Sequence, residues 1–189
     1  LYVGSIRRHK NISALLDVFG RFRRKNTGVS LVMVGKHGQD IDIKRDGVAY
    51  LGELESDKDL AGIYNQACCL FNLSLYEGFG LTILEAEKCG LPVICSDIPV
   101  HREIGGDGIL AVHPSYIDQI CENLYNVLFN NSVRESLVLK GLENVKRFDW
   151  LLTARKTLEL YRKVHNESSD CSRLADGHAG RGKDSQCFL

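Results

Sequence analysis

The sequence predicts an α/β fold in which a parallel sheet is covered by helices on both faces, a doubly wound arrangement. Short apolar runs rich in β-branched residues alternate with segments whose apolar residues recur at helical spacing. Such alternation is typical of strands joined by crossover helices, which make neighbouring strands parallel. The chain has 189 residues, 44% apolar and 25% charged, which is an ordinary globular composition and a length suited to one domain.

The individual elements follow from local pattern and punctuation. Leu15, Leu16, Phe19 and Phe22 recur on one face of a predicted helix. The runs 30–35 and 48–52 are continuously apolar and predict strands buried on both faces. Gly90 and the nearby proline predict the end of a short helix. The expected strands end or lie at 1–3, 30–35, 48–52, 68–75, 92–96 and 108–112, and the expected helices span 12–24, 56–67, 81–89, 115–130, 133–148 and 150–165.

The domain is expected to span residues 1–165 and to be followed by a disordered tail, 166–189. The tail is polar and has few large apolar side chains to offset the entropy of ordering. The chain opens at Leu1 without Met or a signal peptide, from which we expect that sequence upstream has been removed. The seven cysteines are odd in number and show no CxxC spacing, so we expect reduced thiols and a cytoplasmic protein.

Charge and missing motifs exclude several function classes. Lys plus Arg and Asp plus Glu are each 24, which argues against a nucleic-acid partner bound by a basic face. The uncharged stretch 67–76 is too short to span a membrane as a helix. The sequence contains neither GxGxxG nor GxxxxGK[ST], so the phosphate loops of dinucleotide enzymes and P-loop NTPases are not supported.

The segment 74–87 places a glycine loop between a predicted strand and a predicted helix. Helix N-termini at this edge of an α/β sheet bind anions through free backbone N–H groups. Gly78 and Gly80 would allow a phosphate or a sugar to approach the backbone closely. Glu77 and Glu85 would flank the bound group, although the spacing alone equally allows a solvated Glu77 and a Glu85 that only favours the helix dipole.

A second loop, 4–11, also follows a strand and precedes a helix. It gathers Arg7, Arg8, His9 and Lys10, which would suit a diphosphate, unless the run is simply a solvated basic loop. We single out Lys10 here. Two further segments have weaker patterns: 35–38 is expected to be a polar turn, and 101–106 a connection in which Glu103 orients the loop or forms a salt bridge.

The run EGFGLTILEAEKCGLPVICSDIPVHREIGGDGILAVHP resembles the core of the GT-B glycosyltransferases of family 4, retaining enzymes with a Glu-x7-Glu motif. Glu77 and Glu85 stand at the two motif positions. The resemblance extends over residues 1–165, with YVGSIRRHKN similar to the donor-phosphate loop of the family. It implies a Rossmann-like half of a GT-B enzyme that moves a hexose from a nucleotide sugar to a glycan or lipid-linked acceptor.

The resemblance also implies roles for individual residues. Glu85 would bind the ribose hydroxyls, Glu77 would contact the transferred sugar at the reaction centre, and Lys10 would neutralise the diphosphate. Backbone N–H groups of Phe79, Gly80 and Leu81, next to Gly78, would hold sugar and phosphate. The family uses no metal or other cofactor in this half, and a peripheral membrane contact of the full-length enzyme would fit a lipid-linked acceptor.

The sequence departs from the family pattern in ways that leave alternatives open. Ser5 stands where many members carry an arginine, so Arg7 or Arg8 takes over that charge, and we favour Arg8. The N-terminal, acceptor-binding domain of the family is absent from these residues, so donor binding alone is expected. The alternatives are a non-catalytic nucleotide-sugar-binding partner subunit, a GT-B nucleotide-sugar epimerase, and a flavodoxin-like interaction module.

Overall fold

A computed structural model of the chain describes residues 1–38 and 41–176. By its internal contacts the chain divides into two units: the first spans Leu1–Arg147 and the second begins at Phe148. The strands of the first unit are β1 (Tyr2–Val3), β2 (Leu31–Val34), β3 (Val48–Tyr50), β4 (Leu70–Asn72), β5 (Val93–Ser96) and β6 (Ile109–Val112). Its helices are α1 (Ile12–Arg23), α2 (Asp57–Gln66), α3 (Leu81–Lys88), α4 (Pro99–Gly105), α5 (Ile117–Phe129) and α6 (Asn131–Asn144).

The strands are parallel and form two three-stranded sheets, β1-β2-β3 and β4-β5-β6. Backbone hydrogen bonds join these sheets where β1 meets β4: the Leu1 nitrogen donates to the Cys69 carbonyl, and the Phe71 N–H donates to the Leu1 carbonyl over 2.8 Å. The combined strand order is therefore β3-β2-β1-β4-β5-β6. This order confirms the doubly wound fold, and it places the reversal of strand order between β1 and β4.

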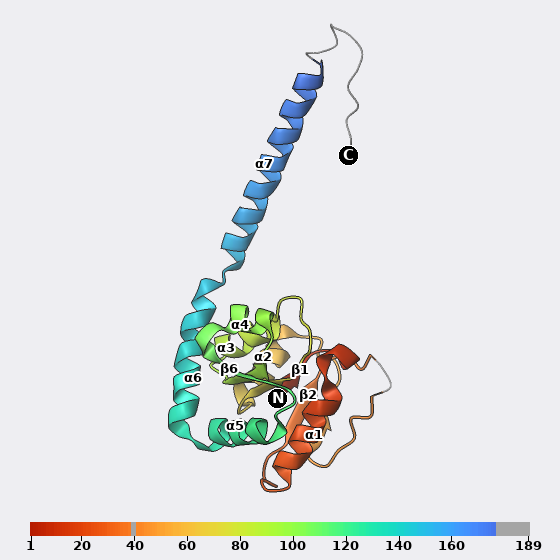
Figure 1. Ribbon diagram of the computed structural model, residues 1–189, viewed down its shortest axis with the longest axis vertical. Helices are drawn as coiled ribbons and strands as arrows, with labels where there is room; N and C mark the ends of the chain where they lie inside the picture. Colours follow the sequence, from red (N-terminus) through yellow and green to blue (C-terminus); the bar gives the residue numbers. More distant parts are fainter. Residues whose placement is uncertain (39–40, 177–189) are drawn as a thin grey trace. The chain divides into compact units, whose positions relative to one another are not determined.

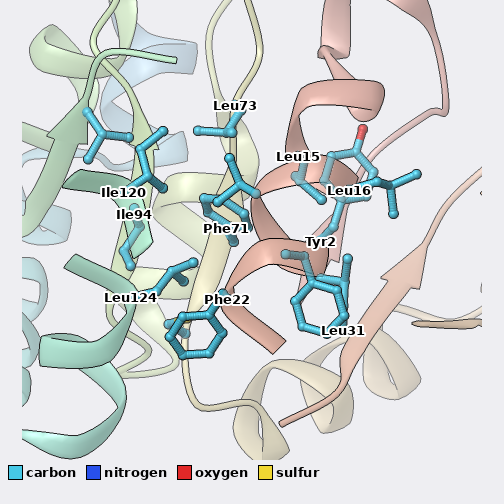
Figure 2. Packing of buried hydrophobic residues seen from close by; sticks show 14 of the residues in the cluster. Tyr2, Leu15, Leu16, Phe22, Leu31, Phe71, Leu73, Ile94, Ile120 and Leu124 are labelled. Carbon is cyan, nitrogen blue, oxygen red and sulfur yellow. The ribbon is translucent and has the colours of Figure 1, made fainter. Parts of the chain in front are cut away.

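Helices lie on both sides of the strands (Figure 1). Two clusters of buried side chains fill the space between the helices and the two faces of the sheet. Consecutive residues of each central strand belong to different clusters. In β4 and β5, Phe71 and Ile94 belong to the first cluster, and Leu70 and Val93 belong to the second. Helices α1 and α5 cover the first face, whereas α2 and α3 cover the second. Figure 2 shows the first cluster, where side chains of α1 lie beside Tyr2 and Phe71, and Ile94 lies beside Ile120 and Leu124 of α5. The alternation explains why consecutive residues of the central strands are apolar until each strand reaches its carboxyl end.

Burial of the helix faces follows the sequence pattern, whereas burial of β3 does not. Leu15, Leu16, Phe19 and Phe22 are all buried, as their spacing predicts. The prediction that β3 is buried on both faces is wrong, because Ala49 and Tyr50 are exposed. The reason is position: β3 is the last strand of its sheet, and an edge strand lacks a neighbour on one side.

Other differences concern helices. The connection expected after β5 contains α4, which begins with Pro99 in its first turn, where the ring is tolerated because that N–H has no helical acceptor. Helix α7 (Trp150–Asp176) belongs to the second unit, so the expected domain boundary at 165 lies inside a helix. Residues 166–176, expected in the disordered tail, are helical; no Gly or Pro interrupts 150–176. The remainder of the expected tail, 177–189, lies outside the described residues.

The described cysteines are free thiols, as expected: Cys68, Cys69, Cys89, Cys95 and Cys121. Cys69 and Cys95 are buried, whereas Cys68 is exposed and is not a core residue. Burial raises the pKa of the Cys95 thiol, which favours the protonated form.

Candidate functional site at the carboxyl edge of the sheet

The two loops singled out from the sequence leave β1 and β4, the strands between which the strand order reverses. The Leu75 N–H donates to the His9 carbonyl over 2.8 Å and so connects the loops directly. Gly4 and Gly35 allow the neighbouring loops to approach, since a Cβ on Gly35, which has φ +129°, would lie 2.2 Å from the Gly4 carbonyl oxygen. The sheet topology thus brings the basic loop and the glycine loop to one point, where open α/β sheets bind ligands.

Lys10 and Glu77 form an ion pair at this point. Nζ of Lys10 donates to both carboxylate oxygens of Glu77, over 2.6 and 2.7 Å. The side chains are only 17% and 11% exposed, so solvent screens the pair less than it would a surface salt bridge. The structure therefore brings together the residues predicted for diphosphate and sugar binding, and it couples their charges.

Two polar residues of β4 and its exit loop complete the surroundings of Glu77. The Ser74 hydroxyl lies 2.7 Å from Oε1 of Glu77, and the Asn72 amide donates to the same oxygen at 3.5 Å. Burial alone would raise the pKa of Glu77, but these hydrogen bonds and the Lys10 charge outweigh it and hold the pKa below its ordinary value. Glu77 is thus an ionised acceptor. Sequence reasoning missed Asn72 and Ser74, which had appeared only as strand residues.

Helix α3 follows the glycine loop directly, and no side chain caps its N-terminus. Gly80 occupies the N-cap position with φ +95° and offers no side-chain acceptor to the first N–H groups of α3. A Cβ on Gly78 would meet nothing within 4 Å, so the space beside Gly78 is open to an approaching group. Phe79 and Leu81 are 45% and 46% exposed. The positive end of the α3 dipole therefore lies at a loop with exposed side chains.

Glu85 is positioned separately, from the neighbouring helix. It is exposed, and its Oε2 accepts a 2.8 Å hydrogen bond from the hydroxyl of Tyr64 on α2, a residue that is itself only 2% exposed. Burial and the adjacent Glu85 charge raise the pKa of Tyr64, so the phenol stays protonated and donates. Sequence reasoning missed Tyr64, because its contact with Glu85 is visible only once α2 and α3 are packed.

The hydrogen bonds described above for Lys10 and Glu77 do not involve Arg8. It is exposed in the 3-10 turn Arg8–Lys10 and lines a shallow hollow with Ser13 and Arg45. The turn at 35–38 is largely exposed, and its His37 ring lies 3.1 Å from the Ile41 carbonyl. Glu103 is exposed, and the salt bridge of α4 is made instead by Arg102 with Asp97.

Two buried polar residues near the site were not predicted to matter. His101, on α4, is fully buried and contacts Ser96 at the end of β5. Glu87, on α3, is 1% exposed and accepts a 2.7 Å hydrogen bond from the Asn144 amide. Its burial raises its pKa to about 7, against weaker opposing effects of Asn144 and Arg147.

A metal site, a membrane-spanning helix and other hollows are features that the described structure could hold outside the loop cluster. Among the residues that the structure describes, no group of three or more His, Cys, Asp or Glu side chains could hold a metal ion. Within the same part of the chain, no helix is both long and apolar enough to cross a membrane. An apolar hollow lined by Phe19, Phe22 and Leu124 contains none of the predicted site residues.

Comparison with known sequences identifies relatives. Residues 1–144 match the family described as glycosyl transferases group 1. The chain is 33% identical over 172 residues to O-antigen chain mannosyltransferase B of Escherichia coli, covering 86% of this chain and 45% of that protein. It is 27% identical over 168 residues to the phosphatidyl-myo-inositol mannosyltransferase of Mycobacterium leprae, covering 85% and 45%. The chain thus spans about half the length of these curated relatives.

Solved structures show the same fold. The sucrose-phosphate synthase of Thermosynechococcus elongatus matches with a TM-score of 0.72 and 23% identity, over 88% of this chain and 46% of that one. The pneumococcal O-GlcNAc transferase in complex with UDP and GlcNAc matches with a TM-score of 0.67 and 21% identity, over 88% and 35%. The C-terminal domain of a glycosyl transferase group 1 protein of Francisella tularensis matches with a TM-score of 0.67 and 20% identity, over 77% and 83%.

Proposed function

Because the chain belongs to the glycosyl transferases group 1 family, we propose that its carboxyl-edge site binds the nucleotide-sugar donor of a retaining hexosyltransferase. The observation that carries this proposal is the Lys10–Glu77 pair, held between two strand exits beside the uncapped start of α3. A cation, an ionised acceptor and the first backbone N–H groups of α3 meet there. These are the groups that a diphosphate joined to a polyol requires.

The pairing of Lys10 with Glu77 is compatible with diphosphate binding. An ammonium group has three N–H donors, and the two short contacts to Glu77 occupy two of them. The third can donate to a phosphate oxygen while the pair persists. Lys10 would then stabilise the charge that develops on the leaving diphosphate as the glycosidic bond breaks, and Arg8 would add a more distant positive charge.

The remaining roles follow from the same arrangement. Backbone N–H groups of Phe79, Gly80 and Leu81 would hold phosphate and sugar oxygens at the dipole end of α3. Glu85, oriented by Tyr64, would accept hydrogen bonds from both hydroxyls of the ribose. Nothing in this set calls for a metal ion, because the cation and the helix dipole already face the diphosphate.

Glu77 is best suited to accept hydrogen bonds from sugar hydroxyls close to the anomeric carbon. Its carboxylate is already bound by Lys10 and Ser74, which lowers its nucleophilicity. We therefore propose a front-face route in which the leaving phosphate assists the incoming acceptor and configuration is retained.

The donor half is proposed to be the C-terminal half of a two-domain enzyme. The likeness to the Francisella C-terminal domain and the 45% coverage of the curated relatives support this placement. The relatives named as mannosyltransferases favour a mannosyl donor and a glycan or lipid-linked acceptor. A cytoplasmic location and a peripheral membrane contact stay predictions from the sequence.

Calorimetric titration of the 189-residue chain with GDP, UDP, GDP-mannose and UDP-GlcNAc tests the proposal. We expect Lys10→Met to weaken diphosphate binding about tenfold or more, as the loss of a charge-assisted hydrogen bond predicts. Lys88→Met removes the same charge from the exposed far end of α3 and serves as the control. If the folded wild-type chain binds none of the four ligands, the donor site is refuted.

Transfer itself separates an enzyme from a non-catalytic binding subunit. We expect the full-length protein to turn over the donor that binds, and Glu77→Ala to abolish transfer while the free nucleotide still binds. Full-length protein that binds donor yet transfers to no offered acceptor would favour the subunit.

A further inference from the structure

His101 is a fully buried imidazole whose hydrogen bonds leave one ring nitrogen unused. Nδ1 lies 2.9 Å from the Ser96 carbonyl oxygen and 3.2 Å from the Ser96 hydroxyl. A carbonyl oxygen can only accept, so Nδ1 carries the proton. Burial is the main cause that lowers the pKa of His101, so the ring is neutral and Nε2 presents a bare lone pair.

Nε2 has no hydrogen-bond partner among the described residues. Buried polar atoms are rarely unpaired in folded proteins, so a group absent from the chain itself is the natural partner. The unpaired side of the ring lies at the glycine loop, because Cδ2, the carbon bonded to Nε2, is 3.8 Å from the position a Cβ would take on Gly80. The charges of Glu77 and Lys10 also act on this imidazole.

We propose that Nε2 of His101 accepts a hydrogen bond from a hydroxyl group of the donor sugar, at the start of α3. This rests on the proposed donor site and adds a residue that decides how the sugar is recognised. A neutral lone pair suits an O–H donor and does not suit an ionised phosphate, whose oxygens only accept. Glu77 is likewise an acceptor, so both side chains suit hydroxyl groups, whereas backbone N–H groups suit phosphate.

The absence of a side chain on Gly80 is part of this arrangement. Gly80 is itself buried, and a Cβ on it would lie 3.8 Å from Cδ2 of the imidazole, against the unpaired side of the ring. Opposite the unpaired nitrogen, His101 is fixed through Ser96, whose hydroxyl donates to the Ser74 carbonyl. Ser74 in turn contacts Glu77, so one chain of hydrogen bonds sets the positions of both acceptors.

Two substitutions of His101 distinguish the contributions of the two ring nitrogens to binding. In His101→Asn the amide lies where Nδ1 was and can still donate to Ser96, whereas in His101→Gln it reaches the position of Nε2 and supplies an acceptor there. We expect Asn to weaken binding of the nucleotide sugar about five- to tenfold, the loss of one hydrogen bond, and Gln to bind within about threefold of wild type. Binding of the free nucleotide, GDP or UDP, should change in neither variant.

The outcomes are distinct. Equal loss of free nucleotide and nucleotide sugar in both variants, or loss confined to His101→Gln, would overturn the proposal, since the Nδ1 contact or the fold would then carry the effect. Failure of the folded wild type to bind either ligand would refute the donor site and this proposal with it. Thermal unfolding of each variant shows whether it is folded.

A measurement on the wild-type chain tests the same hydrogen bond and does not depend on whether a variant folds. In ¹⁵N-histidine-labelled protein, an unprotonated Nε2 resonates apart from the protonated nitrogen and shifts upfield when it accepts a hydrogen bond. We expect GDP-mannose or UDP-GlcNAc, whichever binds, to produce this shift at His101 and the matching free nucleotide not to do so. An unchanged Nε2 signal at saturation with the nucleotide sugar would contradict the assignment.

Discussion

Replacing Glu87 by Gln is expected to change how the stability of the domain depends on pH. The Glu87 carboxylate lies between α3 and α6, where Asn144 donates to Oε2 and no described residue bonds Oε1. Gly108 and Gly141 approach it closely, since a Cβ on either would lie 2.5 to 3.0 Å from the Glu87 side chain. Gln has nearly the same shape, keeps an oxygen for the Asn144 amide, and cannot ionise.

The magnitude follows from the shift of the pKa. Folding raises the pKa of Glu87 from 4.5 to about 7, mainly through burial. At about 1.4 kcal/mol per pKa unit, this corresponds to roughly 3 kcal/mol in the free energy of unfolding. Because the folded state holds the proton more tightly, this stabilisation is complete below pH 4.5. It is lost as the pH rises to about 7, and Gln should lack this loss.

Urea unfolding of both proteins, followed by circular dichroism from pH 4.5 to 8, measures the difference directly. Relative to wild type, Glu87→Gln should gain about 3 kcal/mol across this range. Glu135→Gln, which removes an exposed carboxylate from α6, corrects for the change in net charge. A difference between wild type and Glu87→Gln that does not vary with pH would show that Glu87 is ionised in the folded protein throughout, and the reasoning would fail.

Three further outcomes are expected. Gly80→Ala should lower the free energy of unfolding by about 1–3 kcal/mol because φ is +95°, whereas Gly78→Ala, in open space, should leave thermal unfolding unchanged and weaken nucleotide-sugar binding in calorimetry. Tyr64→Phe should weaken nucleotide binding a few-fold, since Glu85 loses its orienting hydroxyl; unchanged affinity would contradict that role. Adding EDTA should leave the calorimetric Kd unchanged, and a marked rise in Kd would reveal a metal requirement.

Much of the fold could be predicted because it depends on local pattern. The spacing of apolar residues located α1, and Gly90 located the end of α3. The topology also made the meeting of Lys10 and Glu77 predictable, since parallel strands deliver their exit loops to one edge. Burial was less predictable: the sequence of β3 does not show that it is an edge strand.

Apart from the local contacts of Asn72 and Ser74 with Glu77, the contacts that sequence reasoning missed are made across elements. Tyr64 and Glu85 lie on different helices, and Glu87 and Asn144 are 57 residues apart. Nothing local distinguishes a helix glutamate that faces solvent from one that faces a neighbouring helix. The same holds for His101, whose short helix α4 was expected to be a connection.

The place where the nucleotide sugar binds is the central element of the proposed function. Amide chemical shifts of the ¹⁵N-labelled chain, recorded while the binding nucleotide sugar is added, test this directly. The largest changes are expected at Lys10 and at 78–82, with small changes around Phe19 and Leu124 in the apolar hollow. Saturable binding whose shifts cluster at that hollow, and leave the glycine loop unmoved, would contradict the account.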